Sequence, residues 1–141
     1  MRRYAERTRV PALQTRNEVD AMLRKRGATG VLLGTTSDQA MVMFEMQGWR
    51  VKFLLPLPTV TRSQSQSKVD AETRRRWRAL LLVIKAKLEA VASNIVAFER
   101  EFLPFIVTNA GGQTVADQLL PTLGTIVTSG ELPRLLGPGA P

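Results

Sequence analysis

The sequence predicts a single α+β domain, in which a small three-stranded antiparallel sheet packs on one long helix and a helical C-terminal extension follows. Three observations carry this prediction. An apolar seam of helical spacing runs through residues 67–95, alternating apolar segments precede it between residues 29 and 55, and helical spacing resumes after residue 95, interrupted by prolines. The 141 residues suit one domain with a real core.

We expect three regions along the chain. Residues 1–16 carry five arginines and are predicted to be a flexible basic arm, the α+β domain covers residues 17–129, and residues 130–141 form a tail rich in proline and glycine. The first helix is predicted to begin at Asn17, a good N-cap residue. Its end is marked by the basic run at residues 24–26, whose positive charges interact favourably with the negative end of the helix dipole, and by Gly27 as the residue after the cap.

Three strands are expected next, at Thr29–Gly34, Ala40–Met46 and Trp49–Leu55, with Gln47-Gly48 as a tight hairpin turn. Alternation in the third strand puts four residues on one face, which should pack on the long helix: Trp49, Val51, Phe53 and Leu55.

The opposite face of the third strand carries Arg50 and Lys52, which are either solvated or part of a binding surface. The methionines at 41, 43 and 46 are interpreted as core filling, with an adaptable interface as the alternative.

The central helix is predicted over Ser67–Ile95, with Ser67 and Asp70 as a capping pair. Its seam consists of Trp77, Leu80, Leu81, Ile84, Leu88, Val91 and Ile95.

Basic residues flank this seam. Arg74, Arg78 and Lys85 fall in one narrow stripe beside it, and Arg75 lies further round on the same side. Arginines in the first turns oppose the helix dipole, so the arrangement favours an anionic partner. The alternative is a solvated basic face.

The C-terminal part is expected to be helical but broken. Pro104 and Pro121 should interrupt the helices, residues 109–112 should form a turn, and Thr114 with Asp117 should cap a helix. Phe98, Phe102 and Phe105 supply its apolar side.

Composition excludes several kinds of chemistry. The sequence has no cysteine and no histidine, which excludes disulfides, thiol and histidine catalysis, and zinc sites built on these residues. A magnesium site at Glu99, Glu101 and Asp117 is disfavoured, because residues two apart do not share a helix face. We therefore expect neither a cofactor nor enzymatic activity.

The net charge is +8, and it is concentrated in two blocks: residues 1–26 hold eight basic and three acidic residues, and residues 62–87 hold eight and two. This asymmetry favours nucleic acid or another acidic surface as partner. No apolar run reaches the length of a membrane span and the N-terminus lacks a signal peptide, so we expect no membrane contact and a cytoplasmic protein.

The expected order of helix, three strands and long helix resembles that of a double-stranded-RNA-binding domain. The glycine- and lysine-rich loop of such domains is replaced here by SQSQSKVDAETRRR.

The chain also resembles small uncharacterised proteins encoded by tailed bacteriophages and prophages, through RYAERTRVPALQTRNEVDAML, WRVKFLLPLP, RRRWRALLLVIKAKLEAVAS, FEREFLPFIV and TVADQLLP. That resemblance implies a phage origin and action in the cytoplasm of a host bacterium.

Two function classes follow. The first is a phage accessory protein of replication, recombination or regulation that binds DNA or RNA non-specifically through a basic helix face. Its contact residues would be Arg74, Arg75, Arg78 and Lys85, supported by the N-terminal arginines and by Arg50 and Lys52. Trp49 or Trp77 would be the candidates for base stacking. The second is a protein-binding modulator or inhibitor of a host enzyme or defence system. Self-association is left open.

Overall fold

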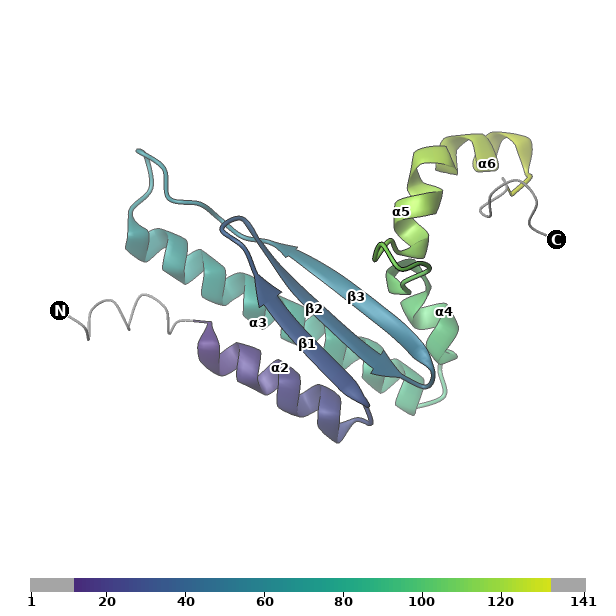
Figure 1. Ribbon diagram of the computed structural model, residues 1–141, viewed down its shortest axis with the longest axis horizontal. Helices are drawn as coiled ribbons and strands as arrows, with labels where there is room; N and C mark the ends of the chain where they lie inside the picture. Colours follow the sequence, from purple (N-terminus) through teal and green to yellow (C-terminus); the bar gives the residue numbers. More distant parts are fainter. Residues whose placement is uncertain (1–11, 133–141) are drawn as a thin grey trace.

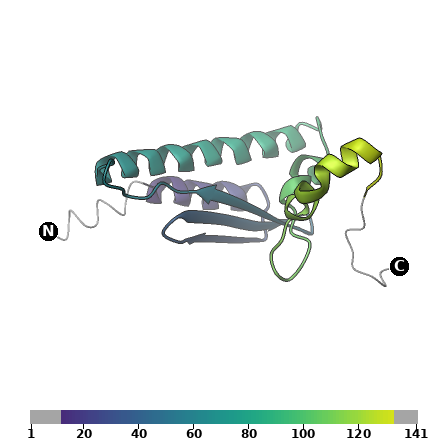
Figure 2. The same cartoon turned by 90° about the horizontal axis from the view of Figure 1, so that it is seen from above.

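Three antiparallel strands form a sheet in the order β1-β2-β3, and two long helices cover one of its faces (Figures 1 and 2). The computed structural model describes residues 12–132. The predicted α+β architecture with a helical C-terminal part is confirmed. The two helices, α2 (Leu13–Lys25) and α3 (Gln66–Ala92), flank the sheet in the chain.

The strands are β1 (Gly30–Thr35), β2 (Gln39–Met46) and β3 (Trp49–Pro56), each within one residue of its predicted bounds. Their side chains alternate between the two faces of the sheet. The inward positions on β2 and β3 are buried: Ala40, Val42, Phe44, Met46, Val51 and Phe53. The expected packing of this face on α3 is confirmed, except that Trp49 at the start of β3 is 39% exposed.

The turn between β2 and β3 is the tight hairpin that the sequence predicts. Gln47 and Gly48 have φ values of 52° and 81°. Two successive residues of positive φ make a turn whose twist matches that of the paired strands. Glycine suits the second position because it has no Cβ to oppose the left-handed conformation.

Replacing Gly48 with alanine should therefore destabilise the protein by about 1–2 kcal/mol, the usual cost of a left-handed conformation for a residue with a Cβ. A Cβ at Gly48 would meet no atom within 4 Å, so the whole effect is conformational. Gly30→Ala is the matched control, because that Cβ also meets nothing and φ is not positive. Urea unfolding measures both variants. Equal stability of the two would contradict this account of the turn.

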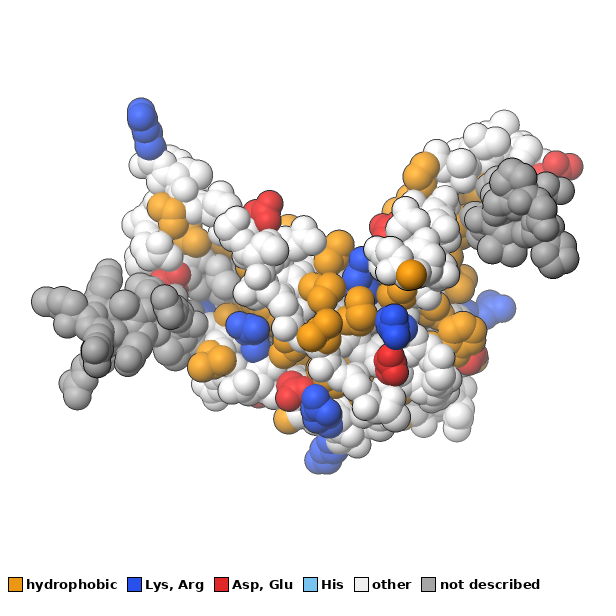
Figure 3. Space-filling model, in the orientation of Figure 1, with side chains coloured by type: hydrophobic (Ala, Val, Ile, Leu, Met, Phe, Trp, Pro, Cys, Tyr) orange, Lys and Arg blue, Asp and Glu red, His pale blue; other side chains and the backbone are white. Residues whose placement is uncertain are grey.

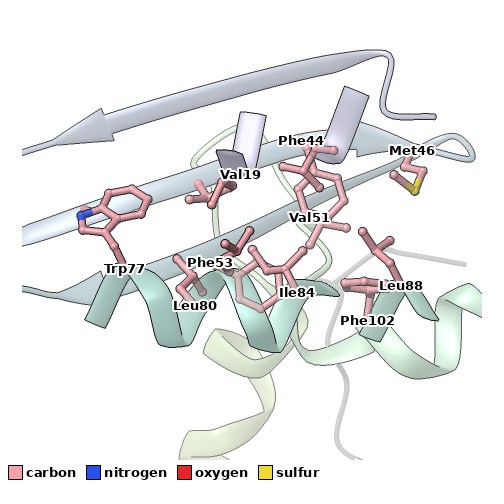
Figure 4. Close-up of a cluster of buried hydrophobic side chains, with 14 of the residues drawn as sticks. Val19, Phe44, Met46, Val51, Phe53, Trp77, Leu80, Ile84, Leu88 and Phe102 are labelled. Atoms are coloured by element: carbon pink, nitrogen blue, oxygen red, sulfur yellow. The ribbon is translucent and has the colours of Figure 1, made fainter. Parts of the chain in front are cut away.

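Helix α3 lies along the sheet and supplies the other half of the core (Figure 4). Its seam side chains Trp77, Leu80, Leu81, Ile84 and Leu88 are buried, as predicted.

The predicted ends of α3 need correction. Ser65 caps it rather than Ser67, accepting a hydrogen bond from the backbone N–H of Lys68 at 3.4 Å. Ile95 is 79% exposed, because the helix ends at Ala92 and Asn94 turns the chain with a φ of 60°.

Helix α2 begins at Leu13, not at Asn17. Buried Ala12 and Thr15 hold the first turn against the body of the protein, so apolar packing places the start of this helix without a side-chain cap. Residues 13–16, expected in the basic arm, are thus helical. The predicted arm residues 1–11 and tail residues 133–141 lie outside the described part of the chain.

After α3, a short helix α4 (Phe98–Phe102) and the 3-10 helix η1 (Leu103–Phe105) bring an aromatic cluster under the sheet. Phe102 is fully buried, with its ring edge-on to Phe44 and Phe53 at centroid distances of 6.0 and 6.3 Å. The chain then pairs with the free edge of β3, where the N–H of Val107 donates to the carbonyl of Arg50 at 2.8 Å.

The last described segment is an arm built from α5 (Val115–Leu119), the 3-10 helix η2 (Leu120–Thr122) and α6 (Leu123–Ser129). The predicted capping box of Thr114 and Asp117 is present, and the helix breaks next to Pro121 as expected. No residue of α5, η2 or α6 is buried. Figure 1 shows this arm projecting from one end of the sheet, beyond β3.

Candidate nucleic-acid interface

One edge of α3, the edge beside α2, carries a stripe of cations. Two ion pairs show which edge of α3 this is. Arg78 lies 3.6 Å from a carboxylate oxygen of Glu18 on α2, and Glu89 lies 3.1 Å from the guanidinium of Arg26, just after α2. Positions 74, 78, 85 and 89 are separated by four, seven and four residues, so they fall on the same edge of the helix. We call Arg74, Arg78 and Lys85 the basic stripe.

The basic stripe is open to solvent. Arg74 and Lys85 are exposed, and neither makes a hydrogen bond or an ion pair with another residue between 12 and 132. Arg78 has one loose contact, the 3.6 Å approach to Glu18, and more than half of its side chain is exposed. Two full positive charges and one weakly paired charge therefore face outwards along about three turns of α3.

Arg75 differs from the stripe because its charge is already matched. Its Nε and one terminal nitrogen donate to the two oxygens of Glu72, both at 2.9 Å. Arg76 donates to the same carboxylate at 2.8 Å and to the carbonyl of Pro56 at 2.7 Å. The hydrogen bonds from Arg76 and then Arg75 lower the pKa of Glu72. Glu72 thus supplies an internal anion to two of the three consecutive arginines at positions 74–76. Because α3 begins at Gln66, these arginines lie in its third turn and not in the first turns as expected.

Replacing Glu72 with glutamine should change two measurable properties. Because the pKa of Glu72 is lowered by folding, its ion pairs stabilise the fold above the ordinary value of 4.5 and are lost as pH falls through the folded pKa. The Gln variant should therefore lose less stability than the wild type between about pH 6 and about pH 3. It should also bind phosphates more tightly, with the salt slope steeper by about 0.9 for each released arginine that gains a contact.

Urea unfolding at the two pH values and binding titrations test this prediction. Asp70→Asn serves as the control, since within residues 12–132 Asp70 makes no ion pair and its side chain accepts from that of Gln66 alone. An unchanged pH dependence in the Glu72 variant would show that these ion pairs do not contribute.

Arg50 and Lys52 lie on the other side of the molecule from the basic stripe. They alternate with buried Val51 and Phe53, so they project from the sheet face that the helices do not cover. Arg50 donates to Glu45 at 3.0 Å, and the ammonium of Lys52 bonds the carbonyl of Gly112. The structure therefore separates the six predicted contact residues into four on α3 and two on the far face.

Neither tryptophan adjoins the stripe as an exposed stacking platform. Trp77 is only 1% exposed and belongs to the core. The guanidinium of Arg16 on α2 lies 5.6 Å from the centroid of its ring system. Trp49 is exposed, but it is on β3, and its indole N–H donates to Glu99 at 3.1 Å.

The carboxylates considered for magnesium have internal partners instead. Glu101 pairs with Lys87 at 2.9 Å, Glu99 accepts from Trp49, and Asp117 accepts from the backbone N–H of Thr114, the main cause of its lowered pKa. Among residues 12–132, no group of three or more acidic side chains gathers in a way that could hold a metal ion.

Sequence reasoning missed the acidic side chains that adjoin the stripe. Glu18 reaches the stripe from α2, and nothing in the spacing within α3 predicts this, because the approach depends on how the helices pack. Helical spacing does place Glu89 on the same edge of α3, but its ion pair with Arg26, just after α2, also depends on that packing. The alternation of charge along this edge is therefore a tertiary feature.

Comparison with models of known families, with curated proteins and with solved structures finds no match to this chain. The fold and the placement of its charges therefore carry the functional argument. Within the described residues, no helix combines the length and the apolar character needed to cross a bilayer.

Proposed function

We propose that this protein binds nucleic acid without sequence preference, through contacts from Arg74, Arg78 and Lys85 to backbone phosphates. One observation carries the proposal: these cations share one exposed edge of α3 and are at most weakly paired within the described chain. Long cationic side chains recognise phosphates by charge and do not by themselves distinguish bases.

The dimensions of the stripe fit a phosphate backbone. A rise of 1.5 Å per residue puts positions 74 and 85 about 16 Å apart along the helix axis. Phosphates on one strand of a duplex recur every ~3.4 Å along its axis. The stripe therefore extends over roughly five nucleotides, which is enough for its three cations to contact separate phosphates.

The non-specific mode follows from what surrounds these cations. Trp77, the aromatic residue nearest them on α3, is buried and cannot stack on a base. The order α2-β1-β2-β3-α3 is also that of a double-stranded-RNA-binding domain, whose contacts read duplex shape, phosphates and 2′-hydroxyls. Together with the resemblance to phage-encoded proteins, this supports a non-catalytic accessory role in phage replication, recombination or regulation, in the cytoplasm of a host bacterium.

A direct binding assay tests the proposal. Fluorescence anisotropy would compare labelled 20-base-pair RNA and DNA duplexes with the corresponding single strands at about 0.1 M salt. We expect micromolar affinity and little change when the base sequence is scrambled. Absence of binding to all four probes at about 50 mM salt would overturn it.

A second function is favoured by a separate observation. The outward face of α3 carries Leu82 and Val83, which are 57% and 46% exposed, next to a stripe that Glu18 and Glu89 interrupt. Exposed leucine and valine beside mixed charges suit a protein surface. The alternative function is a modulator of a host enzyme or defence system that presents acidic residues to α3.

The two functions respond differently to one substitution. Leu82→Ser should leave the affinity for duplexes unchanged and weaken capture of a host protein. Excess competitor DNA should displace a nucleic-acid ligand and leave a protein partner in place. Loss of duplex binding in the Leu82 variant would contradict the phosphate model, because this side chain offers no charge.

A further inference from the structure

The face of the sheet opposite the helices has an apolar centre, which no helix of the described residues covers. Leu32 on β1 pairs with Met43 on β2, and Met41 on β2 pairs with Leu54 on β3, so these four side chains form two adjoining rows. Leu32 is 57% and Leu54 is 49% exposed. Figure 3 looks onto this side and shows hydrophobic side chains gathered over the middle of the sheet. The predicted core role of Met41 and Met43 is therefore wrong, because inward positions alternate with theirs.

This face is also hollowed. A depression of about 440 Å³ is lined by Leu32, Met43 and Arg50, among others. A second depression of about 420 Å³ adjoins the first and shares Glu45 and Arg50 with it. It extends to residues 107–110, where the chain runs beside the edge of β3. The hollow therefore has an apolar floor with a charged pair at one end.

The C-terminal arm carries a matching apolar surface. Leu120, Leu123 and Val127 recur at intervals of three and four residues, and they are 62%, 46% and 76% exposed. No residue of η2 or α6 is buried, so within residues 12–132 the protein does not bury these apolar side chains.

We propose that the C-terminal arm of one molecule docks on the uncovered sheet face of a second copy. Charge supports this occupant. Residues 113–132 contain two acidic and no basic residues, whereas residues 12–112 contain fifteen basic and nine acidic residues. The arm is thus an apolar and acidic element, and the surface that receives it belongs to a basic body, with the Arg50–Glu45 ion pair at the margin of the hollow.

The size of the contact suits a stable dimer. Residues 119–132 and the eleven outward strand positions amount to about 25 residues per copy, within the 20–30 per partner of a standard interface. In a two-fold arrangement each copy gives one arm and receives one, so the same contact forms twice.

The arm is directed away from the sheet of its own chain. Its first turn is fixed by the capping box and by pairing of Val107 with Thr114, which anchors the arm beside β3. In Figures 1 and 2, α6 lies beyond the end of the sheet rather than over its face. A second molecule can receive the arm without any change in this anchor.

Cysteine cross-linking tests the inference cleanly, because the sequence has no cysteine of its own. Val127→Cys and Leu32→Cys would be purified separately, mixed at about 50 μM and oxidised. We expect a disulfide-linked pair containing one chain of each variant. Val127→Cys mixed with Ile95→Cys is the control, because Ile95 is exposed in the turn after α3 and belongs to neither of the two surfaces.

The outcomes separate the possible occupants. Cross-linking between chains, at a rate well above that of the control mixture, supports the proposal. Cross-linking within single chains of the Leu32→Cys/Val127→Cys double variant, with no linked pair, would mean that the arm folds back on its own sheet and would overturn it. No cross-link in either experiment would overturn it as well.

Sedimentation velocity gives an independent readout. The wild type is expected to be dimeric at about 50 μM, and Leu123→Glu/Val127→Glu to be monomeric, since a charge in an apolar contact is costly. Ile95→Glu should remain dimeric. All three positions are exposed in the isolated chain, so these variants should keep the fold. A monomeric wild type at this concentration would refute the proposal.

Discussion

Replacing Phe102 with alanine is expected to lower the free energy of unfolding by about 3–5 kcal/mol. Phe102 is fully buried, and its ring stacks on Phe98 at 4.5 Å and meets Phe44 and Phe53 edge-on. Alanine would leave a cavity at the point where the C-terminal segment joins the sheet. Since small domains are stable by only about 5–15 kcal/mol, this loss takes a large fraction of the total.

Urea unfolding followed by circular dichroism measures the effect. Leu103→Ala is the matched control, because Leu103 is the next residue and is about half exposed. It should cost less than about 1 kcal/mol, as surface substitutions usually do. A similar loss in both variants would mean that the Phe102 cluster is not the packing centre that the structure indicates.

The largest effect on function is expected from Arg74→Ala/Arg78→Ala/Lys85→Ala. Removing three phosphate contacts should weaken duplex binding on the order of 100-fold near 0.1 M salt. The side chains are exposed, so the fold should be unaffected. Stability by urea unfolding and affinity by anisotropy would be measured on the same preparation.

Two controls separate this effect from a general loss of charge. Arg50→Ala removes a cation from the far sheet face, and Arg75→Ala removes one that Glu72 already neutralises. Each should change affinity by less than the average loss per residue of the triple variant. If Arg50→Ala weakens binding as much as a stripe residue does while its sedimentation matches that of the wild type, the contact surface includes the far face and the stripe alone is an incomplete description.

Sequence periodicity was sufficient to predict the strands and the central helix. Apolar residues alternate in Trp49–Leu55 and recur every three or four residues from Trp77 to Leu88. These two spacings identify the face of the strand and the face of the helix that pack into the core. The glycine at 48 and the capping box at Thr114 are local signals of similar strength, and both are present as predicted.

The start of α2 and the role of Ile95 could not be predicted because both depend on tertiary packing. Asn17 is a good cap in isolation, yet buried Thr15 extends the helix beyond it. Ile95 continues the apolar spacing of α3, but the helix has already ended before it. Periodicity shows which residues could share a face and does not show where the chain leaves the helix.

The candidate site was predictable only in part. The common edge of Arg74, Arg78 and Lys85 follows from helical geometry, whereas the opposite placement of Arg50 and Lys52 depends on which sheet face the helices cover. The pairing of Arg75 with Glu72 was within reach of the sequence, since residues three apart on a helix are neighbours.

The most direct test of the central claim is the salt dependence of duplex binding, compared between the wild type and the triple variant of the basic stripe. The slope of log K against log salt concentration should be less steep in the triple variant by about 2.7, the contribution of three phosphate contacts. For the stripe alone, this corresponds to a roughly 40-fold loss of affinity between 50 and 200 mM salt. Equal slopes for the two proteins would contradict the assignment of Arg74, Arg78 and Lys85 as phosphate contacts.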